Sequence, residues 1–292
     1  MSVELTEKLV LEAFTENNMP ISQIHSMSAV GGGCIHNAVL LQTNKGPFFL
    51  KWNKGPYAFS QLLHEKIGLD YLNEKKVIRT PEVHFLYKVD ELALLVLEYI
   101  VEGNPTTCDW RDFGVSIAKL HKHSLDKFGF KENNFIGSLP QSNEYQESWA
   151  DFFIYQRIEP MLKMADQSGL IDSSLKKSFS NFYKSVNEIF PEENPALIHG
   201  DLWSGNFLFN KKGIPYIFDP AVYYGHREIE LSFMKLFGGF SPEFFKSYDE
   251  AFPLKKGFEE RVHFYNLYPL LVHVNLFGSS YLQGIKRALS KF

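Results

Sequence analysis

The chain has 292 residues, of which 45% are hydrophobic and 15% aromatic, so it is long and apolar enough to fold around a substantial core. Its formal net charge of −4 argues against nucleic acid or an anionic membrane as the main partner, because affinity for such partners depends on clustered Lys and Arg. Two cysteines, Cys34 and Cys108, cannot build a disulfide framework and indicate a reducing, cytoplasmic compartment.

Hydrophobic periodicity divides the chain into a sheet-rich first third and a helical remainder. Residues 21–98 contain short alternating runs typical of an antiparallel sheet, with one helical stretch at 59–72. After Gly103 the spacing of the apolar residues becomes helical. The helices expected outside the sheet region are 5–17, 110–121, 147–164 and 173–190.

These elements predict an α+β fold with two lobes. Residues 1–98 are expected to form a small antiparallel-sheet lobe with one main helix, and residues 104–292 a larger, mostly helical lobe. Residues 99–103 are the predicted hinge between them, and some closure around a ligand is expected there. The longest apolar run, 92–97, is too short to span a bilayer.

A triple glycine, Gly31, Gly32 and Gly33, lies between two expected strands. Glycines allow backbone N–H groups to approach phosphate oxygens closely, and Lys51 on the next strand can reach the same oxygens with its charge. A simple hairpin with a glycine-rich turn explains the glycines equally well. Glu65 on the helix that follows strengthens the assignment of Lys51 to a phosphate site, because a Lys–Glu pair would fix the direction of the lysine.

The run 92–97 predicts a buried strand that continues to Glu98. In a two-lobed nucleotide-binding protein the chain crosses between the lobes at this point, and exposed backbone there can bind an adenine ring. Glu98, Tyr99 and Ile100 are therefore the candidate adenine-binding residues. A plain core strand is compatible with the same sequence, because main-chain contacts leave little trace in side chains.

The most informative segment is residues 199–206, HGDLWSGN, followed 13 positions later by Asp219. Phosphoryl transfer from a magnesium-bound nucleotide requires a positioned acceptor hydroxyl and neutralised phosphate oxygens. Asp201 can accept the proton of that hydroxyl, while Asn206 and Asp219 offer oxygen ligands to Mg²⁺. His199 is expected to brace the loop. Asp and Asn beside Gly also form ordinary turns, but the combined spacing predicts an ATP and Mg²⁺ site.

Three residues are candidates for binding the acceptor. The indole of Trp203 can pack against a sugar ring, although core packing explains it equally well. Tyr224 and His226 follow Asp219 closely enough to line a pocket beside the metal, as do their neighbours Tyr223 and Arg227.

The sequence also suggests roles for three residues outside the proposed chemistry. Arg227 is expected to form an internal ion pair with Glu228 or Glu230, and His121 is expected to cap the end of its helix. Cys34 follows the triple glycine, so its oxidation, or a disulfide between subunits, would distort ATP binding. The alternative for Cys34 is a small buried hydrophobic residue, and activity with and without reductant separates the two.

Together these segments resemble the fructosamine kinase (ketosamine 3-kinase) family over nearly the whole chain. His-Gly-Asp at 199–201 and Asp-Pro-Ala at 219–221 are shared with the wider aminoglycoside phosphotransferase-like kinases. Three features resemble the fructosamine kinase family more specifically than this wider group. They are Trp203, the Asn-Phe-Ile-Gly run at 134–137 and the Tyr-Tyr-Gly-His-Arg-Glu run at 223–228.

The resemblance implies a protein-kinase-like fold and ATP-dependent phosphorylation of the 3-hydroxyl of a ketosamine, free or on a protein lysine, as in protein deglycation. It places Asp201 at the base position and Asn206 and Asp219 at the metal positions. Two departures from the family pattern, at residues 36–38 and at Ser204, lie outside these chemical groups.

Other functions remain open. A kinase of another hydroxylated amine, such as an aminoglycoside or a choline-like compound, is the nearest alternative, although few acids between residues 219 and 230 are free to bind a polycation. A protein serine kinase is disfavoured because nothing after Asp219 resembles an Ala-Pro-Glu segment. A nucleotide-binding regulator without catalysis would be expected to lack Lys51, Asp201 or Asp219, and all three are present.

Overall fold

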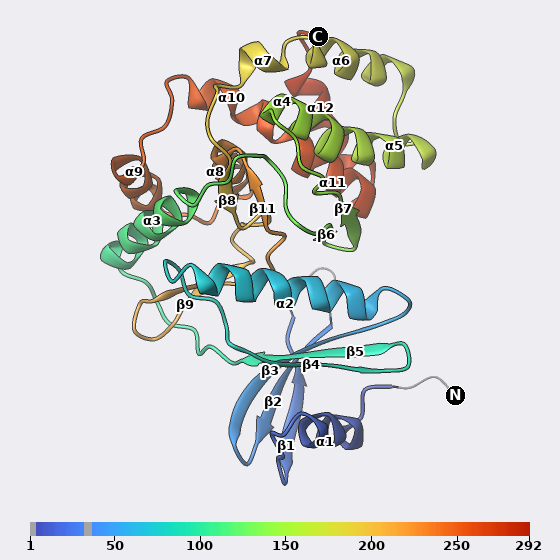
Figure 1. The fold of residues 1–292 in the computed structure, drawn as a ribbon, viewed down its shortest axis with the longest axis vertical. Coiled ribbons are helices and arrows are strands. Elements are labelled where there is room, and N and C mark those ends of the chain that lie inside the picture. The colour runs from blue at the N-terminus through green and yellow to red at the C-terminus, as the bar shows by residue number, and fades with distance from the viewer. Residues whose placement is uncertain (1–3, 32–36) are drawn as a thin grey trace. The chain divides into compact units, whose positions relative to one another are not determined.

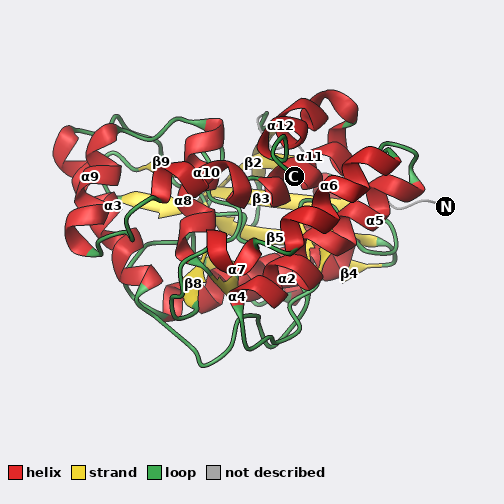
Figure 2. Ribbon diagram, turned by 90° about the horizontal axis from the view of Figure 1, so that it is seen from above, coloured by secondary structure: helices red, strands yellow, loops and turns green. Residues whose placement is uncertain are grey.

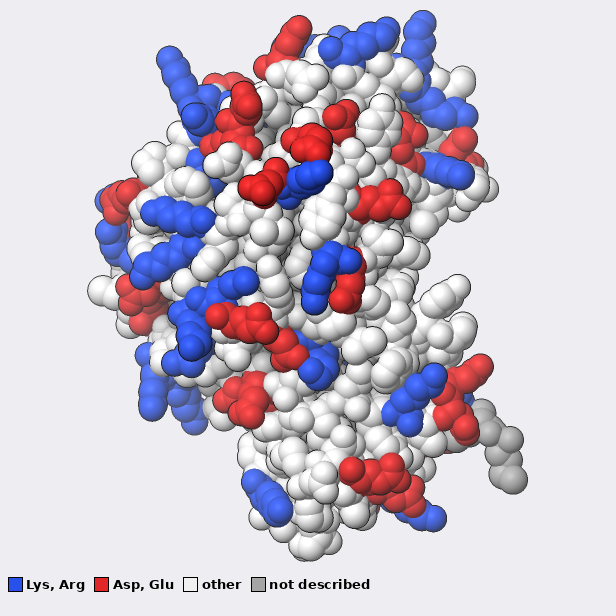
Figure 3. All heavy atoms as spheres, viewed as in Figure 1, with Lys and Arg blue, Asp and Glu red and all other residues white. Residues whose placement is uncertain are grey.

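The computed structural model describes residues 4–31 and 37–292 (Figure 1). The chain forms two compact units, one of Met1–Thr106 with Gly205–Pro220 and one of Thr107–Ser204 with Ala221–Phe292. Among the described residues, no helix combines the length and the apolar character needed to cross a membrane. On the face drawn in Figure 3, basic and acidic side chains are interspersed.

The division into units differs from the predicted one in two places. The first unit continues beyond residue 98, and the hairpin at Gly205–Pro220 groups with it instead of with the helical unit. Backbone hydrogen bonds explain the grouping: the Gly103 N–H donates to the Phe209 carbonyl at 2.8 Å, and the Ile217 N–H donates to the Arg79 carbonyl at 3.0 Å.

The first unit is built on an antiparallel sheet of five strands in the order β1-β2-β3-β5-β4. A second, two-stranded sheet pairs β9 with β10. Thr6 caps the first helix, because its side-chain oxygen accepts the N–H of Leu9 at 3.2 Å. The elements are α1 (Glu7–Glu16), β1 (Ile24–Ala29), β2 (Asn37–Thr43), β3 (Gly46–Lys54), α2 (Ala58–Glu74), β4 (Val83–Val89), β5 (Leu92–Glu98), β9 (Phe207–Phe209) and β10 (Pro215–Ile217).

Strand β5, which lies between β3 and the edge strand β4, is buried on both faces, and its alternating side chains contribute to two cores. The ribbon in Figure 1 shows the strands and helices of this unit. Leu92, Leu94 and Val96 pack with the residues of α1. Ala93, Leu95 and Leu97 pack with Ala58, Leu62 and Leu69 of α2 on the opposite face. A strand buried on both sides therefore fixes the two helices on the two faces of the sheet.

The second unit is mainly helical, as predicted, with short two-stranded sheets between the helices (Figure 2). Gly114 allows α3 to approach α9 closely, because a Cβ there would lie 2.3 Å from the Phe244 carbonyl oxygen. The predicted helix at 147–164 is a run of α4, a π-helix η1 and α5. The elements are α3 (Thr107–His121), β6 (Asn134–Ile136), β7 (Leu139–Gln141), α4 (Trp149–Asp151), η1 (Phe152–Ile158), α5 (Glu159–Gln167), α6 (Ser173–Tyr183), α7 (Val186–Ile189), β8 (Ala196–Ile198), β11 (Tyr223–Gly225), α8 (Arg227–Phe237), α9 (Pro242–Ala251), α10 (Phe258–Tyr265), α11 (Leu267–Phe277), η2 (Ser279–Tyr281) and α12 (Leu282–Ala288).

Candidate active site

A buried lysine is held between two carboxylates in the first unit. Leu50 on β3 faces the core of α1, so the next residue, Lys51, points to the α2 face of the sheet. The Lys51 Nζ donates to Glu65 Oε1 at 2.7 Å and also binds the carboxylate of Asp219. Lys51 and Glu65 are 4% and 6% exposed, so these two side chains interact away from water, whereas the Asp219 side chain is partly exposed. The predicted Lys51–Glu65 pair is confirmed.

The backbone around Asp219 is tightly constrained. Asp219 has a φ of 59°, which places a non-glycine residue in the left-handed region at a cost in free energy. The N–H of Phe218 donates to the Asn206 carbonyl at 3.0 Å, so these two residues face each other at the open end of the β9–β10 hairpin. Gly68 of α2 allows Pro220 to pack closely, because a Cβ there would lie 2.8 Å from Pro220 Cγ.

The surroundings shift the pKa values of the charged cluster. Burial alone would lower the pKa of Lys51, but the charges and hydrogen bonds of Asp219 and Glu65 raise it above its ordinary value. Burial raises the pKa of Glu65 to about 8; the Lys51 ammonium opposes this rise and the charge of Asp219 adds to it. One cation shared by two acids thus keeps the lysine charged and makes Glu65 the group that takes up a proton.

The loop that carries Asp201 lies in the second unit, between the paired strands β8 and β11. Gly200 has a φ of 86°, and a Cβ there would lie 2.1 Å from the Ala221 carbonyl oxygen, so only glycine fits. The N–H of Asp201 donates to His199 Nδ1 at 3.3 Å, and the N–H of Ala221 donates to the His199 carbonyl at 2.9 Å. His199 is fully buried, which confirms that it braces the loop.

A small hollow of about 30 Å³, partly open to solvent, lies beside Asp201 in the second unit. Its walls are mainly apolar and aromatic, and they include one face of the loop itself. Of the described residues that line it, two are acidic, Asp201 and Glu230. The lining residues are Ile136, Ile198, Gly200, Asp201, Tyr223, Ile229, Glu230, Phe233, Tyr268, Pro269, Val272 and His273.

The structure places the candidate acceptor residues in different environments. Trp203 is partly exposed, and its ring lies 6.1 Å from that of Phe237. Tyr223 lines the hollow and Tyr224 does not, because successive residues of a strand point to opposite faces.

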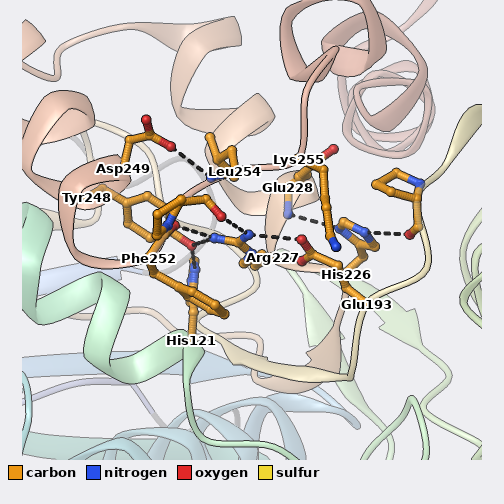
Figure 4. A network of polar contacts seen from close by, with 12 residues as sticks. His121, Glu193, His226, Arg227, Glu228, Tyr248, Asp249, Phe252, Leu254 and Lys255 are labelled. Carbon is orange, nitrogen blue, oxygen red and sulfur yellow. Dashed lines mark hydrogen bonds and ion pairs between the residues drawn. The ribbon is translucent and has the colours of Figure 1, made fainter.

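The prediction that His226 lines the acceptor pocket is wrong. Its side chain is fully buried, where it caps α8 by accepting the N–H of Glu228 at 3.2 Å, and its Nε2 lies 3.1 Å from the Pro191 carbonyl (Figure 4). Burial lowers the pKa of this imidazole below its ordinary value. His226 is therefore a structural residue.

The ion-pair prediction for Arg227 is also wrong in its partners. Arg227 binds Glu193, with Nε to Oε2 at 2.7 Å and Nη2 to Oε1 at 2.9 Å (Figure 4). Glu228 instead binds Arg261, and Glu230 accepts the N–H of Gly200.

His121 also differs from its predicted capping role. Its two ring nitrogens lie 2.8 Å from Tyr248 Oη and from Glu230 Oε2, so the imidazole binds side chains of other helices.

The nucleotide-binding candidates are described in part. Gly31 is exposed, with open space around its Cα, whereas Gly32, Gly33 and Cys34 lie outside the described residues. The N–H of Glu98 donates to the Glu82 carbonyl at 2.8 Å. Strand β5 ends at Glu98, so Tyr99 and Ile100 follow the last residue of the strand. The roles of these residues toward a nucleotide stay predictions.

Kinases that use ATP combine a sheet-rich unit that carries a Lys–Glu pair with a helical unit that carries an Asp-bearing loop. Both units are present in this chain. The crystal structure of aminoglycoside phosphotransferase APH(4)-Ia matches with a TM-score of 0.64, covering 98% of this chain and 97% of that chain. At 15% identity this likeness shows the fold alone, which is the two-lobed α+β fold that the sequence predicted.

The chain belongs to the fructosamine kinase family, whose sequence profile matches residues 7–292. The chloroplastic protein-ribulosamine 3-kinase of Arabidopsis thaliana is 37% identical over 271 residues, covering 89% of this chain and 80% of the plant protein. A crystal structure from Haemophilus somnus 129PT that carries the name fructosamine-3-kinase has a TM-score of 0.86 at 26% identity, covering 97% of this chain and 96% of that one. The predicted family is confirmed, and the chain is an ATP-dependent kinase of the ketosamine type.

Glu65 gives a pH dependence that can be measured without substrate. Its folded pKa of about 8 exceeds the ordinary 4.5, so its contribution to stability is full below about pH 4.5 and is lost as the pH rises through 8. Glu65→Gln mimics the neutral form and removes this contribution. Urea unfolding between about pH 5.5 and 8.5 is expected to show the wild type losing stability relative to Glu65→Gln as the pH rises. Parallel curves for the two proteins would contradict the assignment, and the exposed Glu91→Gln is the control.

Proposed function

We propose that this chain transfers the γ-phosphoryl group of ATP to the 3-hydroxyl of a ketosamine, free or attached to a protein lysine. The observation that carries the proposal is the buried Lys51 ammonium held by Glu65 and Asp219. A fixed cation of this kind can bind phosphate oxygens without first having to be ordered. Family membership supports the choice of a ketosamine as the acceptor.

Asn206 and Asp219 fit a Mg²⁺ ion. Both offer hard oxygen donors, and both lie at the same end of the β9–β10 hairpin. Mg²⁺ usually binds one or two protein carboxylates together with substrate phosphates, and when bound it would neutralise charge on the β- and γ-phosphates. The strained backbone of Asp219 supports the assignment, because such strain concentrates at functional sites.

Asp201 has the role of base in the proposed reaction. Its carboxylate accepts the proton of the acceptor hydroxyl as the bond from that oxygen to the γ-phosphorus forms and the bond to the bridging oxygen of ADP breaks. Within the second unit, the N–H of Ala221 donates to the His199 carbonyl at 2.9 Å, which supports the loop that carries Asp201. Gly31–Gly33 and the backbone of residues 98–100 are the proposed phosphate and adenine contacts.

The hollow beside Asp201 favours a ketosamine over an aminoglycoside. A polycationic acceptor needs several free carboxylates, whereas Glu230, one of the two acids in the lining described above, is already bound to His121 and Gly200. The proposal therefore predicts turnover with ketosamines and not with aminoglycosides.

The direct test supplies purified protein with Mg·ATP and a synthetic fructosamine or ribulosamine, with kanamycin and choline as competing acceptors. ADP release is expected with the ketosamines alone, and ³¹P NMR of the product is expected to place the phosphate on the 3-oxygen. Turnover with the other acceptors at equal rates would overturn the choice of substrate. ATP binding with no turnover of any acceptor would favour a regulator without catalysis.

Asp201→Asn tests the base. We expect the variant to keep its fold and its affinity for ATP and to lose about two to four orders of magnitude in kcat, the usual contribution of a positioned base. Exposed Asp126→Asn in the same unit is the matched control and is expected to retain wild-type turnover. Unchanged kcat in Asp201→Asn would remove Asp201 from the mechanism.

A further inference from the structure

A buried carboxylate on α8 holds the loop that carries Asp201. Glu230 is 3% exposed, and its Oε1 accepts the N–H of Gly200 at 2.7 Å. Its second oxygen, Oε2, lies 2.8 Å from His121 Nε2. Burial alone would raise the pKa of Glu230, but the hydrogen bond and charge of His121 lower it below its ordinary value. The loop thus donates a charge-assisted hydrogen bond to a carboxylate on a helix 30 residues further along the chain.

The position of this bond matters because Gly200 is intrinsically flexible. The dihedral φ of Gly200 lies between two peptide groups: one carries the Gly200 N–H, and the other carries the Asp201 N–H. Glu230 binds the first N–H, and His199 binds the second at 3.3 Å. The two hydrogen bonds fix the peptide planes on both sides of the glycine and therefore set the direction in which Asp201 leaves the loop.

The support behind Glu230 extends through two further helices. His121 of α3 lies with Nδ1 2.8 Å from Tyr248 Oη of α9, and Tyr248 lies 3.4 Å from Arg227 Nη1 (Figure 4). Arg227 is anchored by Glu193 and donates to the Phe252 carbonyl at 2.6 Å. Because His121, Tyr248 and Arg227 are buried and hydrogen-bonded, His121 cannot swing away from Glu230 without breaking further hydrogen bonds.

We propose that Glu230, backed by His121, is a positioning residue of the kinase reaction, which it serves by holding the Gly200 peptide so that the Asp201 carboxylate stays directed at the acceptor hydroxyl. Glu230 itself touches neither acceptor nor nucleotide in this role. This inference rests on the proposed function, in which Asp201 is the base.

The chain supplies a matched control two residues earlier on the same helix. Glu228 is also a fully buried carboxylate, and it binds Arg261 with two hydrogen bonds of 2.6 and 2.8 Å. Removing either acid leaves buried partners unpaired and lowers stability. Glu230 differs from Glu228 in its bond to the backbone next to Asp201, so loss of stability and loss of positioning can be separated.

The experiment measures kcat, KM for ATP and thermal stability for the wild type, Glu230→Ala, Glu230→Asp, Glu230→Gln and Glu228→Ala, with a ketosamine acceptor. Glu230→Ala is expected to lower kcat by about 10- to 100-fold, as a small misplacement of a reacting group does, with KM for ATP within about twofold. Glu230→Gln is expected to recover most of kcat, because its amide oxygen can still accept the Gly200 N–H. Glu228→Ala is expected to lose stability with kcat within about threefold of the wild type.

A second set places Glu230→Ala in the Asp201→Asn background. If Glu230 acts through Asp201, the added change leaves the residual kcat within about twofold, because residues that act as a unit are not additive. Should Glu230→Ala fail to fold, Glu230→Asp decides the matter: it keeps the charge beside His121, but it is one methylene too short to reach Gly200, so its kcat should fall.

Three results would overturn the inference: equal losses of kcat in Glu230→Ala and Glu228→Ala, the full loss repeated in the Asp201→Asn background, or wild-type kcat in Glu230→Asp. Failure of the proposed function looks different, because the wild type itself would then not turn over the ketosamine. The wild-type rate in the same experiment therefore separates the two failures.

Discussion

One buried ammonium organises the sheet unit. Lys51 is bound by Glu65 from α2 and by Asp219 from the segment after β10, so a strand, a helix and a hairpin converge on a single charge. Removing one partner of a buried ion pair typically costs about 3–5 kcal/mol, because the other charge is left without compensation. The cluster has two acids for one cation, and this excess of negative charge contributes to the raised pKa of Glu65. In the proposed reaction, Mg²⁺ at Asp219 and phosphate oxygens at Lys51 would balance these charges.

In the helical unit, a buried charged side chain also fixes a segment of the backbone. The proposed base, Asp201, follows a glycine whose backbone is intrinsically free to rotate, and hydrogen bonds to Glu230 of α8 and to His199 of the loop remove that freedom. Buried polar networks of this kind rigidify a site when every member is bonded, and they are costly when one is missing. Glu228 and Glu230 of α8 are both buried carboxylates with different partners. Glu228 binds the side chain of Arg261, whereas Glu230 binds the backbone of the loop at Gly200.

The sequence predicted the features that depend on local periodicity. The spacing of the apolar residues predicted the helix that carries Glu65, and its predicted pair with Lys51 is confirmed. It failed where partners lie far apart: Arg227 binds Glu193 at a separation of 34 residues, and Arg261 binds Glu228 at a separation of 33. No local pattern indicates which distant element covers a buried charge. The sequence therefore predicts Glu228 or Glu230 as the partner of Arg227 and gives no sign of the contact between Glu230 and the loop.

The most direct test of the account compares Lys51→Met with Lys54→Met, an exposed lysine on the same strand. If the ammonium held by Glu65 and Asp219 binds the phosphates of ATP, the first change lowers kcat/KM for ATP by about two orders of magnitude or more in a protein that remains folded. Lys54→Met should leave kcat/KM unchanged. A kcat/KM in Lys51→Met within about twofold of the wild type would contradict the central role of this cluster.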